Sequence, residues 1–71
     1  MTILATATAR ILDLSALGAG TVIEARRRNE VHYRGCVEHT SPALGVVWIR
    51  DELTGHRAIL HHEDYSLWHV G

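Results

Sequence analysis

The apolar positions between Val31 and His61 fall into three runs that are typical of β-strands. From Val31 to Glu38, apolar or small residues alternate with polar ones, as in a strand with one buried face. Gly45–Arg50 is apolar at four successive positions, which is typical of a strand covered on both faces. His56–His61 predicts a third strand. The three runs together predict an antiparallel meander.

Turn-forming residues separate these runs. Pro42 lacks an amide hydrogen and restricts the residue before it, so we expect the first strand to end before it. Gly55 closes the next turn, where a left-handed residue is favoured. Asn29, in the predicted turn Asn29–Glu30, also tolerates the left-handed conformation.

Two further strands are predicted at Thr21–Arg28 and Leu67–Val70. Arg10–Gly18 has the leucines, the possible N-cap Asp13 and the terminal glycine of one or two helical turns. The fold class is therefore predicted to be mainly β: a five-stranded, strongly bent antiparallel small barrel with a short N-terminal helix.

We expect residues 1–9 to form an N-terminal arm or an edge strand, and residues 10–71 to form the single barrel domain. The first nine residues lack the basic start and long apolar stretch of a secretory signal. We therefore expect a cytoplasmic protein.

Composition indicates a small globular domain that needs additional stabilisation. The 71 residues are 46% hydrophobic and 21% charged, and no run reaches the ~18 apolar residues of a membrane helix. A core of this size holds a chain only marginally, and the single cysteine, Cys36, cannot form an internal disulfide. The expected partner is therefore a second copy of the chain; another protein is an alternative partner, and no membrane is expected.

The chain resembles the Sm-like proteins and, more broadly, small barrels of the Src-homology type. Gly20–Val22, Tyr33–Glu38 and Val46–Asp51 look like the first Sm signature, and the likeness covers roughly residues 10–60. It implies a small bent barrel and, as an alternative function, RNA binding. Where Sm-like proteins place the Asp and Asn that contact uridine, this chain has Ser41, Pro42 and Ala43.

Arginines and aromatic residues are the candidate binding residues. Trp48, in the strand that is apolar on both faces, is the best candidate for a side chain that a partner covers. A basic and aromatic stripe would complete an RNA-binding surface; its members are Arg26, Arg27, Arg28, Tyr33, Arg34, Arg50 and Trp68. The net charge of −1 disfavours a nucleic-acid partner, and nearby glutamates predict cross-strand Arg/Glu pairs instead.

The histidines and the cysteine do not form a recognisable chemical motif. His61 and His62 are adjacent, so in a strand they point to opposite faces. Neither the six histidines nor Cys36 has the spacing of a metal or nucleophile site. We therefore expect no cofactor, no metal and no catalytic residue. The predicted function is a non-catalytic binding or assembly module; a small oligomeric enzyme with a site at the subunit interface is a further alternative.

Overall fold

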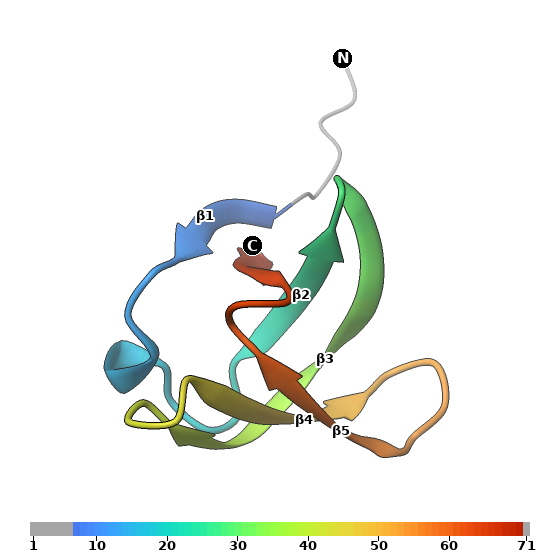
Figure 1. Ribbon diagram of the computed structural model, residues 1–71. Coiled ribbons are helices and arrows are strands. Elements are labelled where there is room, and N and C mark those ends of the chain that lie inside the picture. The colour runs from blue at the N-terminus through green and yellow to red at the C-terminus, as the bar shows by residue number, and fades with distance from the viewer. Residues whose placement is uncertain (1–6, 71) are drawn as a thin grey trace.

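The computed structural model describes residues 7–70. They form a mainly β fold with one sheet of six antiparallel strands (Figure 1). The order of the strands across the sheet is β1-β6-β2-β3-β4-β5. The elements are β1 (Ala7–Ile11), the 3₁₀ turn η1 (Leu14–Ala16), β2 (Val22–Arg27), β3 (Glu30–Ser41), β4 (Val46–Asp51), β5 (Arg57–His61) and β6 (Ser66–Val70). In Figure 1, β3 runs as a long curved strand from its hairpin with β2 to its pairing with β4.

The prediction of five strands closed into a barrel was wrong. The five predicted strands lie side by side as β6-β2-β3-β4-β5, but β1 adds a sixth at the β6 edge. Closing those five strands would require β5 to pair with the free side of β6, and β1 occupies that side, with Ile11 opposite Leu67. Between residues 7 and 70 the sheet is therefore open, with β1 and β5 as its edges.

The predicted helix over Arg10–Gly18 was also wrong. Its first residues extend β1, and only Leu14–Ala16 forms a 3₁₀ turn. Asp13 does cap this turn, as predicted, because its side chain accepts a hydrogen bond from the Ser15 amide at 2.9 Å. One turn is enough to bury Leu14 and Leu17 against the sheet, so burial does not require a longer helix.

The cap makes a small pH dependence expected. Hydrogen bonds from the Ser15 hydroxyl, at 2.6 Å, and from its backbone amide lower the pKa of Asp13 below the ordinary value. A lowered folded-state pKa stabilises the fold above the unfolded-state pKa, and this contribution is lost as pH falls through the folded-state value. We expect Asp13→Asn and Ser15→Ala each to flatten the acid limb of the stability curve, measured by urea unfolding at stepped pH. An unchanged limb in both variants would contradict the capping interpretation.

The core fills the concave side of the bent sheet. Ile23, Val47 and Ile49 are fully buried at its centre. The remaining members of the cluster are Leu14, Leu17, Ala25, Val37, Leu60 and Leu67. Alternate residues of β2 to β6 supply most of these side chains, so the opposite face of each strand is left for polar residues and the candidate sites.

The last residue of the predicted domain and part of the predicted arm lie outside residues 7–70. Of the arm at residues 1–9, residues 1–6 lie outside the described residues, and the last three belong to β1. Gly71, at the end of the domain range, also lies outside them.

Two β-bulges in β3 change which residues share a face. Between β2 and β3, Ala25 pairs with Tyr33 while Arg26 pairs with Val31, so His32 is an extra residue. Between β3 and β4, Glu38 is extra in the same way. A bulge bends its strand and redirects side chains, and β3 thereby continues to Ser41, past the predicted end at Glu38.

The turns follow the predicted chemistry with one shift in position. Gly55 and Asn29 have φ of 73° and 64°, the left-handed conformation expected for both. The β2–β3 turn lies one residue earlier than predicted, because Arg27 pairs with Glu30 and leaves Arg28 and Asn29 as the loop. Arg28 is therefore also left-handed, with φ of 53°.

Candidate functional site

The outer face of β3, β4 and β5 carries a group of aromatic and aliphatic side chains around Trp48. Val47 and Leu60 point into the core, so their neighbours Trp48 and Ile59 point away from it and pair across the strands. The His39 ring lies 5.2 Å from the Trp48 ring. Ile59 is 58% exposed, whereas Trp48 is half-buried. We refer to His39, Trp48, Arg57 and Ile59 as the tryptophan face.

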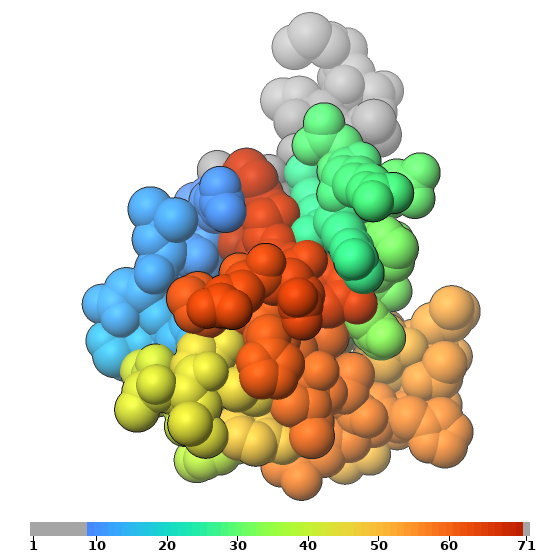
Figure 2. Space-filling view, viewed as in Figure 1, coloured from blue at the N-terminus to red at the C-terminus, as the bar shows by residue number. Residues whose placement is uncertain are grey.

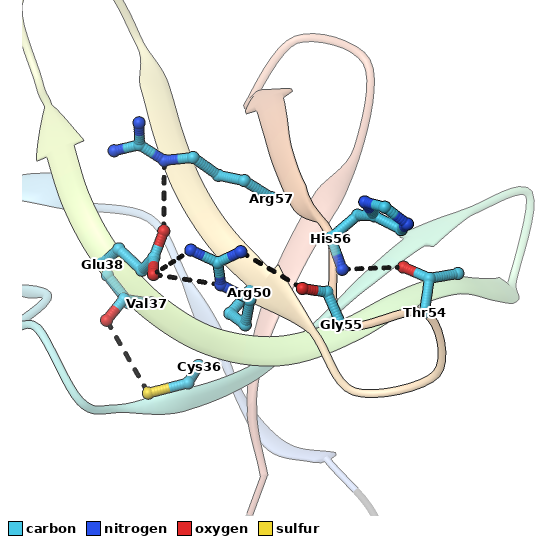
Figure 3. A network of polar contacts seen from close by, with 8 residues as sticks. All are labelled: Cys36, Val37, Glu38, Arg50, Thr54, Gly55, His56 and Arg57. Atoms are coloured by element: carbon cyan, nitrogen blue, oxygen red, sulfur yellow. Dashed lines mark hydrogen bonds and ion pairs between the residues drawn. The ribbon is translucent and has the colours of Figure 1, made fainter.

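Ion pairs of Glu38 lie beside the tryptophan face, and Figure 3 shows those that it makes with Arg50 and Arg57. The Glu38 carboxylate accepts hydrogen bonds from Nε and Nη2 of Arg50 at 3.2 and 3.0 Å, and its other oxygen lies 3.1 Å from Nε of Arg57. Arg50 also donates to the Gly55 carbonyl at 3.1 Å. The Arg57 guanidinium lies 5.9 Å from the Trp48 ring centroid, within range of a cation–π contact. The bulge at Glu38 thus fixes two arginines beside an aromatic surface.

A second cluster surrounds Glu24 on β2. Its side chain is only 8% exposed and lies 3.0 Å from Arg26 and 3.9 Å from Arg34. Arg26 lies over the Trp68 ring at 5.1 Å. The Trp68 indole N–H donates to the Ser66 hydroxyl at 2.9 Å. The charge of Glu24 is thereby compensated within the sheet, as a buried carboxylate requires.

Two hollows open beside the β2–β3 hairpin, whose turn is green in Figure 2. The hairpin hollow, of about 380 Å³, is lined by Arg27, Arg28, Glu30 and His32. The tyrosine hollow, of about 410 Å³, shares His32 and has a partly apolar lining; its other members are Val31, Tyr33, Arg34, Asp51, Glu52 and Leu53. His32 and Tyr33 both contact the Tyr65 ring edge-on, with centroids at 6.0 and 5.8 Å.

The eight residues predicted for binding are divided among these places. Trp48 lies at the centre of the tryptophan face with Arg50 beside it, while Arg26 and Trp68 belong to the Glu24 cluster. The other four line the two hollows: Arg27, Arg28, Tyr33 and Arg34. Glutamates pair with Arg26, Arg34 and Arg50, so these three arginines do not form an uncompensated basic surface.

Sequence reasoning missed His32, His39, Arg57 and Ile59. Ile59 carried a readable signal, because in the alternation of β5 it is an aliphatic residue on the polar side of the strand. Arg57 is on the same side and could have been found with it. His32 carried no such signal, because its direction depends on a bulge against β2.

Within residues 7–70, His, Cys, Asp and Glu side chains do not gather in a group of three that could hold a metal ion. That part of the chain also has no helix of the length and apolarity needed to span a bilayer. Comparisons with protein-family models, curated proteins and solved structures find no match.

Proposed function

We propose that this protein is a non-catalytic assembly module that binds a second copy of itself through edge strand β5 and the tryptophan face. The observation that carries the proposal is the Trp48–Ile59 pair. It is an aromatic and aliphatic surface that points away from the core, immediately beside the open edge of the sheet. Tryptophan and arginine are the residues most often found at the energetic centre of protein interfaces.

The β5 edge suits a two-fold symmetric contact. The side of β5 away from β4 has no strand beside it within the described sheet, so its backbone N–H and C=O groups are available for strand pairing. Antiparallel pairing centred on Ile59 places the Ile59 side chains of both copies opposite each other on one face. Trp48 of each copy then lies directly behind Ile59. The result is one continuous apolar strip across both subunits.

The small core provides a reason for association. The buried hydrophobic side chains of the described chain number ten, and a single core of this size rarely supplies more than about 3–5 kcal/mol. Covering Ile59 and the exposed part of Trp48 adds apolar burial that the lone subunit lacks. Arg57 brings its charge to the contact already paired with Glu38, so it does not enter the interface as an isolated cation.

The pairing of three arginines weighs against the alternative RNA-binding function. Arg26, Arg34 and Arg50 each lie within 4.0 Å of a glutamate carboxylate. Such pairing reduces the positive charge available to a phosphate backbone.

The cytoplasmic location stays a prediction.

Sedimentation equilibrium tests the assembly. We expect the wild-type chain, of 7.9 kDa, to show a concentration-dependent doubling of mass. Ile59→Lys is expected to remain a monomer, because it places a cation at the centre of the apolar strip. Leu44→Lys is the matched control: Leu44 is also a highly exposed aliphatic residue, 71% exposed, but it lies in the β3–β4 loop. A monomeric wild type, or an Ile59→Lys variant that still dimerises, would rule out the proposed interface.

A further inference from the structure

The β2–β3 turn holds an arginine where its backbone favours a different residue. Arg28 and Asn29 form a two-residue hairpin loop with both φ values positive, the conformation for which Asn, Asp and Gly are preferred. A long side chain with a Cβ costs conformational free energy in the left-handed region. Arg28 therefore lowers the stability of the turn. Its guanidinium is the group through which an arginine at this position could serve a function.

The bulge three residues after the turn brings a second polar group to the same place. His32 is the extra residue of β3, and a bulge redirects the side chain that it carries. His32 consequently lines the hairpin hollow together with Arg27 and Arg28. Its ring is also held edge-on to Tyr65 at 6.0 Å. The imidazole is thus a positioned hydrogen-bond donor at the wall of the hollow.

The two arginines of the hollow differ from those in the ion-pair clusters. Arg27 and Arg28 are exposed, and among residues 7–70 neither lies in an ion pair, whereas the four arginines at 26, 34, 50 and 57 do. Glu30 is the one carboxylate in the lining of the hollow. Two guanidinium groups against one carboxylate leave a local positive charge, although the whole chain carries −1.

We propose that the hairpin hollow binds the phosphate group of a small phosphate monoester. Guanidinium groups bind phosphate through paired, charge-assisted N–H donors, and His32 supplies a further N–H. The neighbouring tyrosine hollow shares His32 and includes Val31 and Tyr33, so it receives the apolar or aromatic part of the same ligand. Volumes of about 380 and 410 Å³ lie in the range of small-molecule sites.

A polynucleotide fits this site less well than a small ligand. The lining of the tyrosine hollow includes two carboxylates, Asp51 and Glu52, and one arginine, Arg34. Its net negative charge would repel a second phosphate along a nucleic-acid chain. The overall charge of −1 gives little of the counterion release that stabilises such complexes. A ligand with one phosphate and an uncharged remainder fits both hollows, because the phosphate can lie in the cationic hairpin hollow and the remainder in the tyrosine hollow.

The test is a titration of the full chain with phenyl phosphate, followed through the amide NMR signals. We expect saturable shifts confined to residues 27–34 and 51–53. Arg28→Asn is expected to weaken the affinity for phenyl phosphate about tenfold and yet to raise the melting temperature by about 4 °C, because asparagine relieves the left-handed strain. Asn29→Gly is the matched control, since it also favours the turn but keeps both guanidinium groups.

The outcomes separate binding from a purely structural role. Equal affinity in wild type and Arg28→Asn, or shifts centred elsewhere in the sheet, would overturn the proposal. Tighter binding of a single-stranded oligonucleotide than of phenyl phosphate would overturn the small-ligand assignment. Phenol, which lacks the phosphate, is expected to give no saturable shifts, and binding by phenol equal to that of phenyl phosphate would also contradict the assignment. Self-association through β5 is independent of these results, because Arg28 lies in the β2–β3 turn rather than on β5.

Discussion

Gly35→Ala is expected to remove a large part of the unfolding free energy of this chain. Gly35 lies in β3 opposite Asp51 of β4. A Cβ at this position would overlap the carbonyl oxygen of Arg50 and would lie 2.7 Å from its carbonyl carbon and 3.1 Å from the Asp51 Cα. All three atoms are backbone, so no side-chain rotation can relieve the clash, and β3 must move away from β4.

The expected loss is about 3 kcal/mol or more, as for severe overpacking of a buried position. A single core of this size supplies about 3–5 kcal/mol, so this loss is a large fraction of the whole. Urea unfolding followed by tryptophan fluorescence measures it. Gly18→Ala is the control, because no atom lies within 4 Å of a Cβ built there. Equal urea midpoints for the wild type and Gly35→Ala would show that the two strands can separate without cost.

Ile49→Ala is expected to lose about 2–5 kcal/mol of unfolding free energy. Ile49 is 0% exposed and belongs to the central cluster of the core. Its neighbours across the two adjacent strands are Val37 and Ala58. Truncation removes apolar contacts and leaves a cavity, which the backbone pairing on both sides prevents from collapsing fully.

Ile59→Ala provides the matched control for Ile49→Ala. Ile59 lies on the neighbouring strand but is 58% exposed on the opposite face of the sheet. At a protein concentration where the chain is monomeric, we expect its substitution to change stability by less than about 0.5–1 kcal/mol. Equal losses for the two isoleucines would mean that the sheet does not have the buried face described above.

The sequence predicted the strands better than the sites. The five strands predicted from apolar alternation and turn residues are all present, and Asp13 and Gly55 perform their predicted roles as a cap and as a left-handed turn residue. The alternation predicted for the Val31–Glu38 strand failed at its first residue. Val31 was predicted to lie on the buried face with Tyr33, Gly35 and Val37. Val31 is 52% exposed, because the bulge at His32 separates it from the pattern that holds from Tyr33 onward.

The candidate sites depend on relations that no single segment contains. Trp48 was predicted as a contact residue, but its neighbour Ile59 comes from another strand, and only the pairing of β4 with β5 places the two side by side. For the arginines, a basic stripe was the alternative and cross-strand Arg/Glu pairs were the favoured prediction. The sheet contains such pairs between Arg34 and Glu24 and between Arg50 and Glu38, but which glutamate each arginine meets depends on the strand register.

The sequence by itself determined where this chain is extended and where it turns, because strand alternation and turn preferences act over a few neighbouring residues. Tertiary structure decided the open sheet, since β1 pairs with β6 where a closed barrel would need β5. It also decided the bulges at His32 and Glu38, because an extra residue is defined only against the partner strand. Those two bulges place the histidine in the hairpin hollow and the glutamate between its two arginines.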